Sequence, residues 1–262
     1  MQNRYIGDVG DFGKYGLLQV LCTTADGNPK LSLGVVWYLT YPNQQELSRD
    51  DGKYRSYLNN PQEFRDCAPE LFDQMLISYN DLTHRNISVI PSLGILPSTT
   101  VYYDSPLSFS KMPKIGPKAR DTRLEHRRLW FDGAMKAIGQ ADAVFLDPDN
   151  GLQTKSVHPY NDNGPKYVSD EELSTFLKRD DKCLILYQHG WREKQFTAQC
   201  LRRVGESCED RDPFALLYRR GTQRVFVVAP CKQHHAILLE RSERFIKSRW
   251  KEHFEPRVFR IE

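Results

Sequence analysis

Short, continuously apolar runs that alternate with helical patterns limit what this 262-residue chain can fold into. The clearest runs lie at residues 33–39, 143–146 and 183–187. Uninterrupted apolar segments of this length are typical of strands that are buried on both faces of a parallel sheet. Strands that alternate with helices predict an α/β fold with a doubly wound, mostly parallel, Rossmann-like sheet.

The remaining elements follow from apolar spacing and from capping and turn residues. We expect helices at residues 12–21, 61–79, 119–138, 170–177, 193–204 and 243–250. Further strands are expected at residues 86–90, 99–103 and 235–239, and an antiparallel hairpin at 214–218 and 224–228 ends the sheet. Residues 105–118 hold three prolines and predict a surface loop. We therefore expect one α/β domain over residues 1–262.

Composition narrows the class of protein only a little. The net charge is +3, which does not show nucleic-acid binding by itself. Positive charge nevertheless gathers at residues 111–128, 202–203, 219–224 and 241–251. In the third cluster, Arg219, Arg220 and Arg224 stand at the expected hairpin tip, where they suit contacts with phosphates, and simple solubility is the alternative.

The apolar segments are too short to span a membrane, and the first residues do not have the pattern of a signal peptide. We expect a cytoplasmic protein without membrane contact. The six cysteines have no paired short spacing, which favours free thiols. The cluster at residues 231–235, with Cys200 and Cys208 upstream, matches no zinc-site spacing, so no metal is predicted.

Two carboxylates and an amide follow the apolar run at residues 143–146: Asp147, Asp149 and Asn150. Ligands of open α/β sheets bind in the crevice at the carboxyl ends of the strands, where these side chains are expected. Burying carboxylates is costly, although Pro-Asp-Asn-Gly is also favourable turn chemistry. We predict that Asp147, Asp149 and Asn150 are catalytic, with a plain turn as the alternative.

A second polar loop follows the run at residues 183–187 and contains His189 and Arg192. If the two strands are neighbours, this loop lies beside Asp147. Histidine serves as an acid or base near neutral pH, and arginine holds phosphate with two hydrogen bonds. We assign His189 a catalytic role and assign substrate binding to Tyr187 and Arg192. A histidine that only satisfies the loop backbone is the alternative.

The amino-terminal segment, residues 5–16, is rich in glycine and short acidic residues. Glycine permits close approach of the backbone to a ligand, and Asp11 lies near the start of a helix, where amides point outward. The segment is neither a P-loop nor a dinucleotide fingerprint. We expect Asp8, Asp11, Lys14 and Tyr15 to contact the substrate or a cofactor, with Lys14 and Tyr15 facing the ligand or solvent.

Two short motifs carry a resemblance to a known family. Residues 10–18, GDFGKYGLL, resemble the opening H-A-G-N-x-A-D-V-x-K-H of the ribosomal RNA adenine-N6 methyltransferases, with Lys14 at the family lysine. Asp147 and Pro148 match the first two residues of the family's Asp-Pro-Pro-Tyr. The resemblance follows the element order over roughly residues 1–190. It implies a methyltransferase-like Rossmann fold and the cofactor S-adenosylmethionine (SAM).

The sequence departs from that family at two places. Residues 37–43 lack the glycine-rich turn that seats SAM, and their bulky side chains would fill the cofactor's space. Asp149 and Asn150 replace the proline and the tyrosine that stacks on the flipped adenine. Asp-Pro followed by polar residues also resembles the water-activating motif of uracil-type DNA glycosylases. These departures favour hydrolysis over methyl transfer, without a cofactor.

The leading hypothesis is a DNA glycosylase that removes a modified base, in defence against phage. Asp147 or Asp149 would orient the water, Asn150 would bind the base edge or the water, and His189 would assist. The first alternative is a SAM-dependent adenine-N6 methyltransferase of nucleic acid. The second is a nucleic-acid-binding protein that has no catalytic activity. The expected partner is nucleic acid, with DNA preferred over RNA, and the sequence predicts no oligomeric state.

Overall fold

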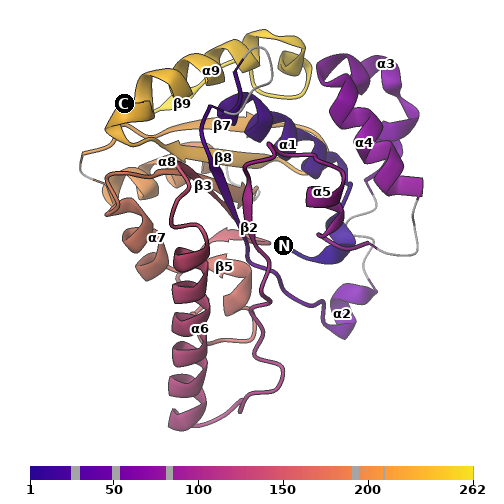
Figure 1. Cartoon of the computed structure of the whole chain (residues 1–262). Coiled ribbons are helices and arrows are strands. Elements are labelled where there is room, and N and C mark those ends of the chain that lie inside the picture. The colour runs from indigo at the N-terminus through magenta and orange to yellow at the C-terminus, as the bar shows by residue number, and fades with distance from the viewer. Residues whose placement is uncertain (25–29, 49–53, 81–84, 191–194, 209, 262) are drawn as a thin grey trace.

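The protein is an α/β fold built around a seven-stranded sheet (Figure 1). The computed structural model describes residues 1–24, 30–48, 54–80, 85–190, 195–208 and 210–261. The strands lie in the order β2-β1-β3-β6-β8-β7-β9. Their bounds are β1 Leu33–Trp37, β2 Val101–Tyr103, β3 Ala143–Asp147, β6 Cys183–His189, β7 Phe214–Tyr218, β8 Arg224–Ala229 and β9 Phe259–Arg260.

Five of the seven strands run in the same direction. β2, β1, β3 and β6 pair in parallel, and β8 pairs with β6 in the opposite direction. β7 returns antiparallel to β8, so it runs parallel to β6, and β9 is antiparallel to β7. The expected hairpin is therefore confirmed, with Gly221 at φ +64° in its turn. β4 Gly151–Leu152 and β5 Tyr167–Val168 form a separate parallel pair.

Helices cover both faces of the sheet. Their bounds are α1 Val9–Cys22, α2 Gln44–Leu47, α3 Pro61–Phe64, α4 Pro69–Asn80, α5 Val89–Ser92, α6 Pro117–Ala137, α7 Asp170–Leu177, α8 Phe196–Glu206 and α9 His235–Lys247. One apolar core joins α1, α4 and α9 to one face, and a second core joins α6, α7 and α8 to the other face. This arrangement is doubly wound, as the alternating pattern predicts.

Two expected strands are wrong. Residues 86–90 form a turn and the start of the short helix α5, because the Val89 and Ile90 amides donate locally to the Asn86 and Ile87 carbonyls at 3.1 and 3.0 Å instead of to a neighbouring strand. Residues 235–239 begin helix α9, whose buried side chains Leu238, Ser242, Phe245 and Ile246 recur at helical spacing. A window of five apolar residues cannot reveal this period.

Two other expectations need smaller corrections. The helix expected at residues 61–79 is divided, because Pro69 begins the new helix α4. The loop at residues 105–118 is partly buried rather than fully on the surface, because Leu107 and Phe109 belong to the apolar core with α6 and β1. The helix expected from residue 119 starts at Pro117. Among the described helices, none is long and apolar enough to cross a membrane.

Candidate active site

A polar cavity of about 320 Å³ opens at the carboxyl ends of β3 and β6. Such crevices are where open α/β sheets bind ligands, and this volume lies at the lower end of the range for ligand sites. The lining residues are Met1, Tyr5, Asp8, Gly10, Asp11, Lys14, Glu46, Tyr54, Asp147, Pro148, Asp149, Asn150, Tyr187, His189, Thr222 and Arg224.

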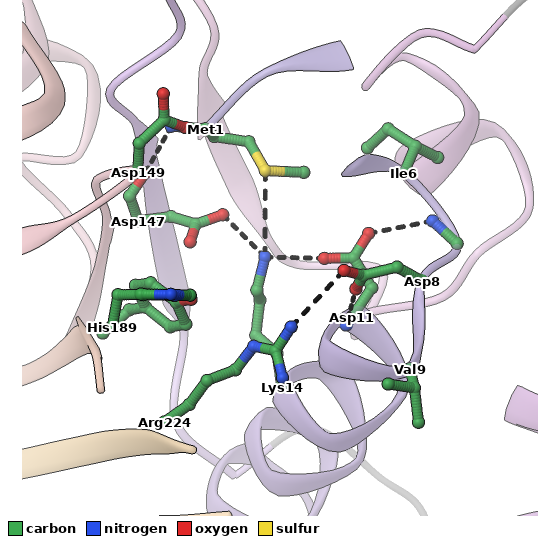
Figure 2. A network of polar contacts seen from close by, with 12 residues as sticks. Met1, Ile6, Asp8, Val9, Asp11, Lys14, Asp147, Asp149, His189 and Arg224 are labelled. Atoms are coloured by element: carbon green, nitrogen blue, oxygen red, sulfur yellow. Dashed lines mark hydrogen bonds and ion pairs between the residues drawn. The ribbon is translucent and has the colours of Figure 1, made fainter. Parts of the chain in front are cut away.

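Lys14 links α1 to the sheet inside this cavity (Figure 2). Its Nζ lies 2.8 Å from Asp11 Oδ1 and 2.8 Å from Asp147 Oδ2. All three side chains are almost fully buried. Burial lowers the pKa of Lys14, but the two carboxylates outweigh this effect and raise that pKa well above its ordinary value. Lys14 is therefore a fixed cation that lines the cavity and is shielded from open solvent, and the other half of the expectation, that it faces a ligand, stays a prediction.

The carboxylates around Lys14 have unequal surroundings. Asp11 Oδ2 accepts a hydrogen bond from the Gly7 amide at 3.0 Å. Asp8 caps α1 by accepting from the Asp11 amide at 2.9 Å, and its other oxygen lies 3.4 Å from Arg224. Burial raises the pKa of Asp11 and that of Asp147, and Lys14 opposes both rises. Lys14 therefore offsets part of the rise in pKa that burial causes at both carboxyl groups, and the pKa of each still lies above its ordinary value.

Asp149 is held on the other side of the β3 loop. The Met1 amino nitrogen lies 2.6 Å from Asp149 Oδ1. Oδ2 accepts hydrogen bonds from the Gln2 amide at 2.8 Å and from the Thr40 hydroxyl at 2.9 Å. Both carboxylate oxygens of Asp149 therefore have partners, and one of these partners is Thr40, which follows β1.

Asp147 keeps one oxygen open. Oδ2 is bound to Lys14, whereas Oδ1 has no hydrogen-bond or ionic partner among the residues that the structure describes. Each carboxylate oxygen of Asp8, Asp11, Asp149 and Glu46 does have a partner. Among these five carboxylates, Asp147 is therefore the one with an oxygen that has no partner in the described part of the chain.

The second loop supplies a histidine and an amide. Tyr187 Oη lies 3.0 Å from His189 Nδ1. Burial raises the pKa of Tyr187 to about 12, so the phenol keeps its proton at neutral pH and is able to donate to the imidazole. Gln188 is buried and donates from Nε2 to the Asn150 carbonyl at 2.8 Å, while its Oε1 accepts from the Leu152 amide at 2.8 Å. Gln188 thus positions the loop that carries Asp147.

Most predicted site residues come together in this cavity. Those that line it are Asp8, Asp11, Lys14, Asp147, Asp149, Asn150, Tyr187, His189 and Arg224. Tyr15 does not, because its ring is fully buried in the apolar core. Arg219 and Arg220 contact η6 Arg249–Glu252 instead, and Arg220 also pairs with Glu63. Arg192 lies outside the described residues.

The glycines of α1 have a different role from the one expected. They make room for protein side chains rather than for a ligand. A Cβ at Gly10 would lie 2.4 Å from the Arg224 guanidinium, one at Gly13 would lie 2.4 Å from the Tyr218 ring, and one at Gly16 would lie 2.2 Å from Trp250. The three-residue spacing places them on neighbouring turns of one helix face. They let α1 approach β7, β8 and η6.

Sequence reasoning missed Gln2, Thr40 and Gln188. Gln2 and Thr40 are neutral polar residues with no motif, and each matters only because the fold brings it against Asp149. Gln188 stands between Tyr187 and His189 in a buried strand. A buried amide side chain needs hydrogen-bond partners, so its position in this strand could have indicated a positioning role.

No protein-family model matches this chain, and comparisons with curated proteins and with solved structures also find no match. Within the described residues, no cluster of metal-ligating side chains is found.

Proposed function

We propose that the protein hydrolyses the N-glycosidic bond of a modified base in DNA, with Asp147 as the residue that activates water. The observation that carries this proposal is the open Oδ1 of Asp147 in a cavity where the neighbouring carboxylate oxygens have partners. Lys14 fixes the carboxylate at 2.8 Å and favours its ionised form against the effect of burial. A buried, oriented carboxylate with one free oxygen is the arrangement that a general base requires.

The chemical step breaks the bond between the sugar C1′ and the base nitrogen, and the electron pair leaves with the base. Water attacks C1′, and its proton passes to Asp147 Oδ1. The sugar carries positive charge as the bond breaks. Carboxylates outnumber cations by one around the cavity when the Lys166 partner of Glu46 is included, since five carboxylates face three side-chain cations and the Met1 amino group. This surplus of negative charge stabilises a cation-like sugar.

The departing base needs a proton and a partner for its edge. Tyr187 Oη lies 3.0 Å from His189 Nδ1, and in the tautomer in which Nδ1 accepts this hydrogen bond the imidazole would give its Nε2 proton to the base nitrogen. The Asn150 side chain lies on the same loop as Asp147 and supplies both a donor and an acceptor to the base edge. A base must leave the duplex to reach this cavity, which is the way enzymes of this class reach their target atom.

The test is release of a base from DNA. Duplexes with plain or modified bases, such as hydroxymethylated and glucosylated cytosine, are incubated with the protein and then cleaved at abasic sites with alkali. We expect cleavage of at least one modified duplex. Asp147→Asn should lower the rate by at least a hundredfold. Asp142→Asn is the matched control, because Asp142 precedes the same strand at its other end and binds Ser32. Equal activity of Asp147→Asn and wild type would refute the proposal.

A methyltransferase is the second candidate, and one contact favours it. Lys14 and Asp147, the two residues that carry the family resemblance, lie 133 positions apart in the sequence and meet at 2.8 Å. In that case Asp147 Oδ1 would accept the amino proton of an adenine. Calorimetry separates the two candidates: micromolar binding of SAM supports methyl transfer and contradicts the hydrolase, and absence of heat supports the hydrolase.

A further inference from the structure

The first half of α6 and the segment before it project beyond the carboxyl edge of the sheet (Figure 1). α6 has 21 residues and is therefore about 31 Å long. β3, which follows it, has five residues and spans only about 17 Å. Because α6 runs back to the start of β3, its amino-terminal end lies on the side of the sheet where the cavity opens.

This projection, residues 111–120, is a basic prong. Lys111, Lys114, Lys118 and Arg120 are all exposed, and the segment contains no acidic residue. None of the four cations makes an ion pair with another residue in the described part of the chain. Their charges are therefore left for a partner outside the molecule.

The prong ends in an apolar side chain. Ile115 is 93% exposed, the highest value among the large exposed hydrophobic residues of the described chain. The base of the prong is fixed, because Ala119 is buried and Met112 packs against the core next to α6. Arg120 lies over the Tyr160 ring at 5.2 Å, which holds its guanidinium in place. An exposed isoleucine on a fixed support, surrounded by cations, suits a partner that offers both phosphates and an apolar cleft.

We infer that the basic prong binds duplex DNA, with its four cations on backbone phosphates and Ile115 as an apolar wedge in the minor groove. Proteins that bend DNA insert isoleucine and similar side chains between base steps in this way. The wedge unstacks bases at the carboxyl edge of the sheet, which is the edge where the cavity opens. This inference rests on the proposed action on DNA, and it assigns to the prong the task of opening the duplex on the side of the sheet where the cavity opens.

The test measures binding alone, so it does not depend on turnover. Fluorescence anisotropy follows a labelled, unmodified DNA duplex with full-length protein at several salt concentrations. The variant Lys111→Gln/Lys114→Gln/Lys118→Gln should bind at least tenfold more weakly. Its plot of log affinity against log salt concentration should be shallower by about 0.9 for each phosphate that the variant no longer neutralises. Ile115→Ser should weaken binding with no change in that slope.

The matched control removes the same charge from the opposite edge of the sheet. Three exposed lysines serve for this: Lys30 lies before β1, Lys178 lies before β6, and Lys232 follows β8. Because β8 is antiparallel to β1 and β6, all three lie at the same edge of the sheet. Their triple substitution to glutamine should leave the affinity unchanged. Equal weakening in both triple variants, or tighter binding to anionic vesicles or to duplex RNA than to DNA, would overturn the inference. The assay measures binding to an unmodified duplex without turnover, so a failure of the proposed hydrolysis remains distinguishable from a failure of this inference.

Discussion

Replacement of Lys14 by methionine tests the electrostatics of the site most directly. The substitution keeps the volume of the side chain but leaves Asp11 and Asp147 buried without the cation that contacts both of them. Removing one partner of a buried ion pair typically costs about 3–5 kcal/mol. The loss is limited by proton uptake, because a buried carboxylate without a cation becomes neutral.

The cost of that proton sets the magnitude and its pH dependence. An aspartate has an ordinary pKa of about 3.9, so protonation costs about 5 kcal/mol at pH 7.5 and about 1.5 kcal/mol at pH 5.0. The native variant holds a proton that the unfolded chain releases, so its stability falls as the pH rises. Relative to wild type, we expect Lys14→Met to lose about 3–5 kcal/mol at pH 7.5 and about 1.5 kcal/mol at pH 5.0.

Urea titration followed by tryptophan fluorescence at the two pH values measures this difference. The double variant Lys14→Met/Asp147→Asn provides the control, because it removes one of the two carboxylates along with the lysine. It should recover at least about 1 kcal/mol at pH 7.5 relative to Lys14→Met alone. A loss below about 1 kcal/mol at pH 7.5, or an equal loss at both pH values, would show that Lys14 is not the counter-charge of this cluster.

Three further perturbations test other parts of the fold. Burial and the nearby Arg220 lower the pKa of His253 to about 4. The unfolded chain therefore binds a proton that the native state does not, and the free energy of unfolding should fall by about 3 kcal/mol as the pH drops from 6.5 to 4. His253→Gln should remove this loss in acid titrations. Gly151 has φ +106° and a Cβ there would lie 2.2 Å from Gln188, so Gly151→Ala should cost about 1–3 kcal/mol in urea titrations and lower base release. Gly16→Ala should cost about 1–3 kcal/mol and shift the emission of Trp250, and an unchanged spectrum would contradict the close packing seen there.

The elements with strong local signals could be predicted from the sequence. The apolar runs at β1, β3 and β6 need burial on both faces, and that requirement alone indicates a parallel sheet with helices on both sides. The position of Asp147 at the end of β3 followed from the same run. The Ser169 cap of α7 was equally clear, and the structure shows its capping box with Glu172.

The features that depend on distant segments could not be predicted. The spacing of Gly10, Gly13 and Gly16 suggested a ligand, because nothing local shows that Arg224, Tyr218 and Trp250 will lie against them. Tyr15 shares the motif of Lys14 but points into the apolar core, since successive helix residues face different directions. The proposal of Asp147 rather than Asp149 depends on which oxygens acquire partners, and those partners come from three separate segments of the chain.

The bond between Lys14 and Asp147 also bears on how the protein reaches its native state. The two residues meet only when α1 is seated against a sheet that already contains β3, and Arg224 and Asp8 close the cavity across 216 positions of sequence. Contacts at such separations form late, because the cost of closing long loops comes before their benefit. A nascent or partly folded chain therefore holds its acidic residues in water as ordinary solvated charges. The paired charges of this cavity therefore form together with the complete tertiary structure.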